Sequence, residues 1–446
     1  MRLSDIVRRV FGRLSDTDLK RRYFGGIAWN SLGLVFGRGL GLVGAVIAAR
    51  VLGKEGFGAF GVIQGTVVTF AFVASVSAAV TATKFIAQHR KNDVALAGRF
   101  LALCWATSCL FALLVTGVTW FGAGLICDLY LKAPELKEPL KLAALAVTLS
   151  ALTGTQNGIL TGLERFKVIS ILTVVTGISN LTFIGILAYN YGVAGAVLGI
   201  VISEALLLAL NTYFLSRELR SEGIVADFAG MWNESSVLMK FWFPHLLGSL
   251  LNMPLHWVIS GLLVRQADGI GEMALYTAAY RWRQLILFVP ATLGNVSTPI
   301  LAEKVNLRDT QAVKKVLWAS LFLVGGVSIG LGILISLFGP WIMAQYGDEF
   351  RAGGPIVLFL VLTEAALRSV SVPLTNLTTA AGLMWMNLAC NVISGIVLLG
   401  AAFFLVKQGA VGLAAAHGLS AFVCLVLLFC FVMGFLRKKL FGAMDE

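Results

Sequence analysis

The chain has 446 residues, of which 58% are hydrophobic and only 13% are charged, whereas soluble domains carry roughly 25% charged residues. Apolar runs of about 20 residues, enough for a helix to span a bilayer, recur from one end of the chain to the other. This composition excludes a soluble enzyme, a nucleic-acid-binding protein and a disordered regulator. The net charge of +12 would suggest nucleic acid in a soluble protein, but in a membrane protein it reflects the orientation of the loops.

Twelve apolar segments follow one another, and each of them predicts one transmembrane helix. They cover residues 24–51, 58–83, 95–119, 140–161, 167–189, 193–215, 241–264, 273–300, 316–338, 355–381, 384–406 and 410–436. The sequence therefore predicts an all-α, polytopic membrane protein. Residues 1–22 are basic and polar and do not form a cleavable signal. Their first 14 residues fit a helix on the inner membrane surface, with a frayed basic tail as the alternative.

The distribution of Lys and Arg predicts the orientation in the membrane. If residue 1 is cytoplasmic, 23 of these residues lie in inner segments, 8 lie at outer ends and 4 lie inside helices. Cytoplasmic loops of membrane proteins carry an excess of Lys and Arg. Both termini are therefore predicted to be cytoplasmic.

The chain repeats itself at a nearly constant spacing. Residues 83–88 match residues 298–303 at a shift of 215, and Gly192-Val193-Ala194-Gly195 matches Gly409-Ala410-Val411-Gly412 at a shift of 217. Because each half holds an even number of segments, the halves share one orientation, as parallel repeats do. We expect a cytoplasmic N-terminal segment (1–22), a six-helix bundle (23–215), a cytoplasmic linker (216–240), a second six-helix bundle (241–436) and a cytoplasmic tail (437–446). A cavity should lie between the two bundles.

A glycine-rich run in the first segment predicts close helix packing. Residues 39–44 match the pattern GxGxxG, but they lie inside one apolar helix rather than between a strand and a helix, so nucleotide binding is not expected. A small residue at every fourth position instead allows two helices to approach closely. This stripe consists of Gly33, Gly37, Gly41, Ala45 and Ala49.

The six cysteines lack the spacing of a disulfide framework or a metal site. The sequence therefore predicts no disulfide, no metal and no cofactor.

Four arginines lie deep inside predicted helices. Each would cost ~2.5–3.5 kcal/mol if it faced lipid, so each must face a wet cavity or an acidic partner. These residues are Arg38, Arg281, Arg283 and Arg368.

Two acidic residues offer partners within the membrane. Glu364 and Arg368 are spaced i,i+4 in the favourable order and can neutralise each other, and Glu204 could pair with Arg38. Because titratable groups are costly at this depth, Glu204, Glu364, His256 and His417 are also candidates for ion coupling.

The second half offers a polar surface for a water-filled passage. Arg281 and Arg283 have no acidic neighbour in their own helix, and the preceding segment carries a polar stripe that passes through Asn252, His256 and Ser260. A stripe of this kind can also hold helices together. A positively charged cavity suits an anionic passenger, because guanidinium binds phosphate bidentately. Arg50 and Arg265 would flank the outer mouth or anchor the helices at the interface.

The residues Ala49-Arg50-Val51-Leu52-Gly53-Lys54-Glu55-Gly56-Phe57-Gly58 resemble the R-x-L-G-x-x-x-F-G turn of polysaccharide (Wzx-type, O-antigen) flippases, which belong to the multidrug/oligosaccharidyl-lipid/polysaccharide exporter superfamily. Residues 240–244 and 192–195 resemble the same family. The resemblance implies that undecaprenyl-diphosphate-linked oligosaccharide crosses the bacterial inner membrane by alternating access, with the first, second, seventh and eighth helices lining the cavity. These helices carry Arg38, Asn252, His256, Arg281 and Arg283. Membrane lipids, a polysaccharide polymerase and glycosyltransferases are the implied partners.

Three other classes are less consistent with the sequence. Lipid II flippases resemble this chain but usually carry two further helices. Multidrug exporters of the superfamily bind organic cations with interior carboxylates, and here only Glu204 and Glu364 could serve. A membrane glycosyltransferase or polymerase would need catalytic carboxylates or a metal in sizeable outer loops, and none is visible, so no enzyme is expected. The sugar, the pathway and the coupling ion stay open.

Overall fold

The computed structural model describes residues 17–250, 253–307 and 309–441, and these residues contain helices and no strand. The basic segment 1–16 and the end of the tail lie outside the described residues. The first half contains α2 (Thr17–His89), α3 (Val94–Gly124), α4 (Lys137–Gly162) and α5 (Phe166–Ser221). The second half contains α6 (Phe243–Leu250), α7 (Met253–Val264), α8 (Gly269–Asn306), α9 (Thr310–Leu337), α10 (Gly339–Tyr346), α11 (Gly354–Ala380), α12 (Met384–Leu405) and α13 (Gly409–Phe441). Short turns of π- or 3₁₀-helix connect them, among them η1 (Leu125–Leu131).

Each of the twelve predicted segments overlaps a helix. Within the described residues, six runs are long and apolar enough to cross a membrane. Three of these runs, Phe36–His89, Phe166–Ser221 and Met384–Leu436, each cover two predicted segments. The prediction of an all-helical protein with several membrane spans is confirmed.

Residues with positive φ mark the repeat in the backbone. Gly53 (φ 70°) breaks α2 and Asp268 (φ 54°) precedes α8, while Gly192 (φ 59°) breaks α5 and Gly409 (φ 68°) begins α13. These pairs are separated by 215 and 217 residues, the spacing of the repeat. Glycine adopts this conformation without steric cost. The repeated glycine motif is therefore a turn that reverses the chain between two spans.

The predicted packing stripe is confirmed in part. A Cβ on Gly33 would collide with Ser170, and one on Gly37 would collide with Thr173, both on α5. Ala45 is also buried, whereas a Cβ on Gly41 would meet nothing within 4 Å. The small residues near the start of α2 thus bring it close to α5.

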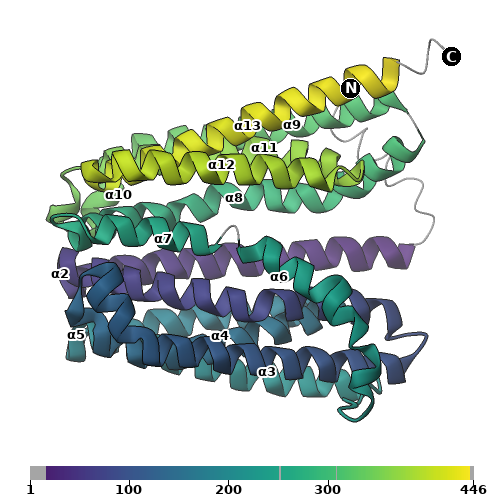
Figure 1. Ribbon diagram of the computed structural model, residues 1–446, viewed down its shortest axis with the longest axis horizontal. Coiled ribbons are helices and arrows are strands. Elements are labelled where there is room, and N and C mark those ends of the chain that lie inside the picture. Colours follow the sequence, from purple (N-terminus) through teal and green to yellow (C-terminus); the bar gives the residue numbers. More distant parts are fainter. Residues whose placement is uncertain (1–16, 251–252, 308, 442–446) are drawn as a thin grey trace.

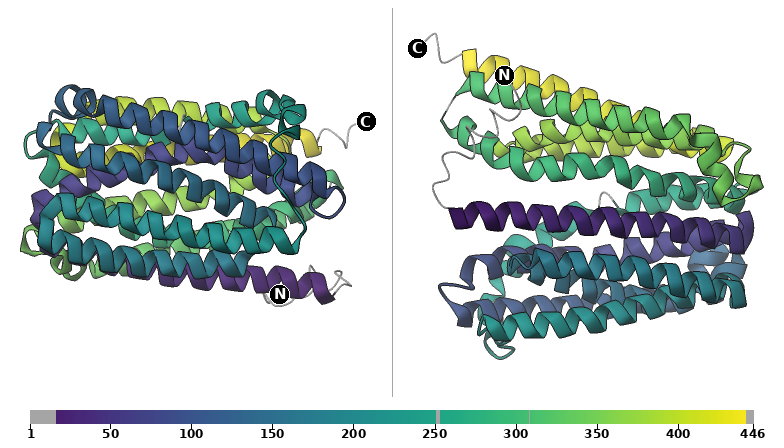
Figure 2. Two further views of the ribbon diagram at one scale, coloured as in Figure 1. Left: turned by 90° about the horizontal axis from the view of Figure 1, so that it is seen from below. Right: turned by 180° about the vertical axis from the view of Figure 1, so that it is seen from behind.

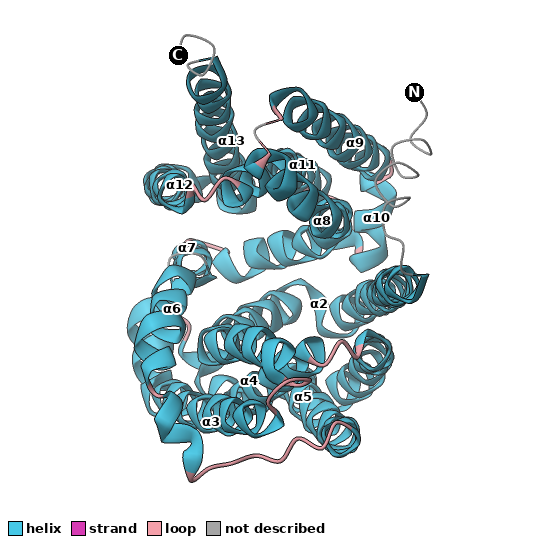
Figure 3. Cartoon of the chain, turned by 90° about the vertical axis from the view of Figure 1, so that its right-hand side faces the viewer, coloured by secondary structure: helices cyan, strands magenta, loops and turns pink. Residues whose placement is uncertain are grey.

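The helices form two groups that run along the long axis of the molecule (Figures 1 and 2). The group α2–α5 lies on one side and the group α8–α13 lies on the other, and α6 and α7 follow one edge between them (Figure 3). The described part of α2 begins and α13 ends at the same end of the molecule (Figure 1). We call this end the inner end, because it carries the predicted cytoplasmic segments.

Within the described residues, the largest buried apolar cluster joins the two groups at the outer end. The largest apolar cluster contains residues of both halves, among them Phe57, Ala274 and Val357. A second cluster belongs to the first half alone and a third to the second half alone, and both contain residues from the inner ends of their helices. Among the described residues, the α2–α5 and α8–α13 groups therefore share an apolar core at the outer end and have separate apolar clusters at the inner end.

Candidate functional site: a basic cavity between the two halves

A cavity of about 300 Å³ lies between the two halves, and α2, η1, α7 and α8 contribute its walls. These helices correspond to the second, seventh and eighth predicted segments, with one residue from η1. The polar side chains that line it are Gln64, Thr69, His256, Ser260, Tyr276, Thr277, Tyr280, Arg281 and Gln284. Among the described residues that line this wall, Arg281 carries a charge and none is acidic.

Amide groups of the opposite half hold two of the predicted arginines. Arg281 on α8 donates a hydrogen bond to Oε1 of Gln64 on α2, and Arg38 on α2 donates to the main-chain oxygen of Gln284 on α8. Each bond leaves the guanidinium with its full charge, because its acceptor is neutral. The expected pair of Arg38 with Glu204 is not among the ion pairs of the described residues.

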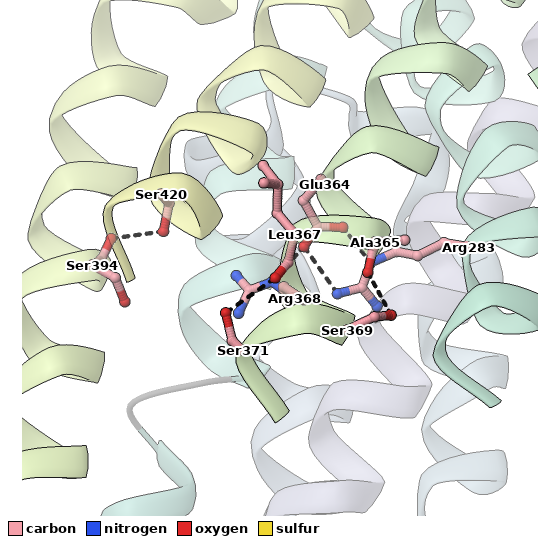
Figure 4. Close-up of polar contacts among 9 residues, drawn as sticks. All are labelled: Arg283, Glu364, Ala365, Leu367, Arg368, Ser369, Ser371, Ser394 and Ser420. Atoms are coloured by element: carbon pink, nitrogen blue, oxygen red, sulfur yellow. Dashed lines mark hydrogen bonds and ion pairs between the residues drawn. The ribbon is translucent and has the colours of Figure 1, made fainter. Parts of the chain in front are cut away.

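Glu364 receives two arginines, as Figure 4 shows. Arg283 on α8 binds its carboxylate bidentately, with Nε 2.6 Å from Oε2 and Nη2 3.1 Å from Oε1. Arg368, one turn along α11, donates its Nε to Oε1. The predicted Glu364–Arg368 pair is confirmed, but it is part of a triad. Arg283 therefore differs from Arg38 and Arg281 in having an acidic partner.

Histidine and tyrosine rings connect the cavity to the interior of the second half. His256 on α7 lines the cavity and stacks on His417 of α13, with ring centroids 4.8 Å apart. The ring centroid of Tyr276 on α8 lies 5.8 Å from that of His417. His417 is 4% exposed. Asn252, predicted on the same polar stripe as His256, lies outside the described residues.

Trp257 on α7 forms part of the cavity wall. The Trp257 ring stacks on Tyr130 at 5.1 Å, and its Nε1 donates to Oγ1 of Thr66 at 2.9 Å. Trp105 and Trp282 pack against apolar clusters instead. Trp257 is thus the tryptophan whose ring borders the cavity.

Polar contacts close the outer end of the cavity. Arg50 Nε donates to the main-chain oxygen of Gln345 at 2.6 Å. Lys54 Nζ lies 3.2 Å from Oδ2 of Asp268, and its main-chain N–H donates to Glu349 at 3.2 Å. Arg50 therefore bridges the two halves at the predicted outer mouth. Arg265 is exposed at the end of α7.

An aromatic cluster lies beneath these contacts. The buried ring of Phe57 on α2 packs 6.1 Å from both Tyr346 and Phe350 of the second half. Next to it, Gly58 lies so close to α8 that a Cβ would overlap the carbonyl oxygen of Ile270. Phe57 and Gly58, which follow the turn at Gly53, thus form the contact that seals the outer end.

Replacement of Gly58 by Ala is expected to open this seal, because the methyl group cannot fit unless α2 and α8 separate. The substitution Ser260→Cys places a reporter cysteine in the cavity. The measurement is the labelling of this cysteine by an impermeant thiol reagent that is applied at the outer end, where Lys54 lies. Labelling should rise several-fold. Gly39→Ala is the matched control, since a Cβ there meets nothing within 4 Å. Equal labelling of both variants would contradict the conclusion that the contact between Gly58 and α8 closes the outer end.

Gln64 is the site residue that the sequence analysis missed. Gln64 is a polar residue inside an apolar segment. Because burying an amide group without a hydrogen bond is costly, its position alone marks it as a candidate. Its partner Arg281 lies 217 residues away, so the contact itself could not be inferred.

Comparison with known proteins agrees with this architecture. The model of the family described as "Polysaccharide biosynthesis protein" matches residues 24–305. The EPS I polysaccharide export inner membrane protein EpsE of Ralstonia nicotianae is 28% identical over 51% of this chain, and the match spans about half (53%) of that relative's length. A putative O-antigen transporter of Shigella flexneri is 22% identical over 75% of this chain and 79% of its own.

The fold matches that of solved transporters. The inward-facing conformation of a multidrug resistance MATE family transporter of the MOP superfamily superposes with a TM-score of 0.75, at 14% identity, over 92% of this chain and 98% of that one. These relatives are transporters or export proteins, in agreement with the expectation that the chain is not an enzyme. The family match covers well over half of the sequence, and the chain therefore belongs to the polysaccharide biosynthesis protein family.

Proposed function

We propose that this protein moves a lipid-linked oligosaccharide, carried on undecaprenyl diphosphate, from the inner to the outer leaflet of the bacterial inner membrane. The observation that carries the proposal is the charge of the cavity. Arg281 lines the cavity, Arg38 donates to Gln284 in its wall, and none of the described wall residues is acidic. A diphosphate is the anion that two guanidinium groups bind well.

The polar wall suits the sugars of such a substrate. Gln64, Ser260 and Gln284 provide hydrogen-bonding groups, and Trp257 provides a flat apolar surface. Arg281 and Arg38 would hold the diphosphate. Asn252 and His256, which the sequence predicts on the cavity helices, are proposed to bind the substrate with them. Arg283 serves the site indirectly, because it neutralises Glu364 and so keeps that carboxylate from repelling the anion.

The shape of the molecule supports transport by alternating access. The outer seal combines the buried apolar cluster shared by the two halves with an aromatic cluster and a surface ion pair, and a surface pair contributes only ~0.2–1 kcal/mol. At the inner end, the described residues of α2–α5 and of α8–α13 belong to separate apolar clusters. Bound substrate favours the state that opens outward when it makes better contacts in that state than in this one.

In the proposed orientation, both termini lie in the cytoplasm together with the segments 84–94 and 216–240. The segments 126–138 and 341–353 lie outside. Single cysteines at positions 225 and 130 should differ in intact cells, with only position 130 labelled by an impermeant thiol reagent. Labelling at 225 and none at 130 would reverse the assignment.

Complementation tests the function itself. The chain should restore surface polysaccharide to a flippase-null strain and prevent lipid-linked oligosaccharide from accumulating in the inner leaflet. A polysaccharide polymerase and glycosyltransferases would act on the two sides of this step. Drug resistance without polysaccharide rescue would instead favour a multidrug exporter, the alternative within the same superfamily.

A further inference from the structure

A second cavity lies inside the second half of the molecule. Its volume is about 300 Å³, and its walls come from α8, α11, α12 and α13. We call it the α11–α12 pocket, because its polar side chains come from those two helices. They belong to Arg368, Ser371, Thr375, Asn376, Asn387 and Asn391. Among the described residues that line this pocket, Arg368 carries a charge and none is acidic.

The ion pairs of Glu364 leave one positive charge beside this pocket. Arg283 and Arg368 both bind the carboxylate of Glu364, so two positive charges meet one negative charge. The side chain of Arg283 is 12% exposed and that of Arg368 is 26% exposed. Arg368 bonds to Glu364 through Nε, and the rest of its guanidinium points away from Glu364, on the side of α12 and α13 (Figure 4). The excess positive charge therefore lies at the pocket.

Other polar groups of the pocket can accept hydrogen bonds. The hydroxyl groups of Ser371 and Thr375 donate to the main-chain oxygens of Leu367 and Ser371, at 3.0 and 3.1 Å. Nδ2 of Asn391 donates to the main-chain oxygen of Asn387 at 2.9 Å. Because these hydrogens are used within the helices, the side-chain oxygens offer their lone pairs to the pocket. A matching ligand therefore carries hydroxyl donors as well as a negative charge.

We propose that the α11–α12 pocket binds an acidic sugar, a uronic acid, of the oligosaccharide that the protein transports. The carboxylate of the sugar binds Arg368 through charge-assisted hydrogen bonds, and the ring hydroxyls donate to the oxygens of Ser371, Thr375 and Asn391. A simple anion such as chloride satisfies the charge but not these acceptors. The volume lies at the lower end of the range for small-molecule sites, roughly 300–1,000 Å³, which suits one sugar ring.

The pocket is a neighbour of the cavity between the halves. Gln284 lines the cavity and Leu287 lines the pocket, and these residues lie about one turn apart on α8. The inference rests on the proposed function and narrows its substrate class. Arg281 holds the diphosphate in the cavity, and Arg368 selects oligosaccharides that carry an acidic sugar.

The test is calorimetric titration of the purified full-length protein in detergent. The three probes are sodium glucuronate, glucose and sodium phosphate, at equal ionic strength. Glucuronate should bind at least about tenfold more tightly than glucose, which lacks the charge, and than phosphate, which lacks the sugar ring. Phosphate binding as tight as that of glucuronate would overturn the sugar site and identify a site for a phosphate group, from a lipid or from solution.

Two variants locate the binding site of glucuronate. Arg368→Met removes the excess charge and leaves Glu364 paired with Arg283, so affinity should fall about tenfold to a hundredfold. If this variant does not fold, Asn391→Leu keeps all three charges and should weaken binding several-fold. Asn190→Leu is the matched control and should bind normally, because Asn190 also donates Nδ2 to the carbonyl four residues earlier, but on α5.

Two outcomes separate the pocket from the cavity and from transport. Glucuronate binding that is lost in Arg281→Ala and kept in Arg368→Met would place the sugar in the cavity and overturn the pocket. Restored polysaccharide in the flippase-null strain without glucuronate binding would overturn the pocket and leave the proposed function intact. Binding that depends on Arg368, without any restored polysaccharide, would support the pocket and contradict the proposed function.

Discussion

Arg281→Glu is expected to abolish export of the polysaccharide. The substitution places a negative charge in the cavity wall, where it repels the diphosphate and leaves Gln64 without its donor. Arg281→Ala removes one charge-assisted hydrogen bond, worth ~1.5–3 kcal/mol, so affinity should fall about tenfold to a hundredfold. Arg281→Lys should keep part of the activity, because it retains the charge but not the bidentate fork.

Each of the three variants is expressed in a flippase-null strain, and the amount of polymer that the strain makes is measured. Protein levels are checked in the membrane fraction. Arg265→Ala is the matched control, because that arginine is exposed at the end of α7 and should reduce export less than twofold. Near-normal export by both the Ala and the Glu variants of Arg281 would exclude an anion site in the cavity.

Glu364→Leu is expected to lower the free energy of unfolding by about 3–5 kcal/mol, the usual effect of removing one partner from a buried ion pair. The Glu364 side chain is 3% exposed, and its removal leaves two guanidinium groups without an acid. Unfolding of the purified protein in increasing SDS gives the measurement. Glu138→Gln, which breaks a surface pair with Lys141, should cost less than about 1 kcal/mol.

A triple variant separates charge from packing. Replacing Arg283 and Arg368 by Met in the Glu364→Leu protein should recover most of the lost stability, since apolar residues can replace a buried ion pair without loss. The double variant Glu364→Gln with Arg368→Ala should recover little, because Arg283 stays uncompensated. Full recovery by that double variant would mean that Arg283 does not depend on Glu364.

The sequence by itself determined the class of this protein and much of its local structure. Apolar length decided where helices form, because a backbone in lipid must satisfy its own hydrogen bonds. The repeated glycine motif predicted that the two halves are related, and Gly192 and Gly409 both adopt the positive φ that glycine favours. The pair Glu364–Arg368 could be predicted because its members lie one helical turn apart.

Only the tertiary structure decided which distant side chains meet. Arg283 finds its acid 81 residues away on α11, and Arg281 finds Gln64 on α2. The expected pair of Arg38 with Glu204 depended on how α2 faces its neighbours, and α2 directs Arg38 to α8. Sequence spacing sets neighbours along one helix, but the rotation and register of packed helices depend on side chains from every element in contact. For that reason the deep arginines could be recognised from sequence, whereas their division between the cavity and the Glu364 triad could not.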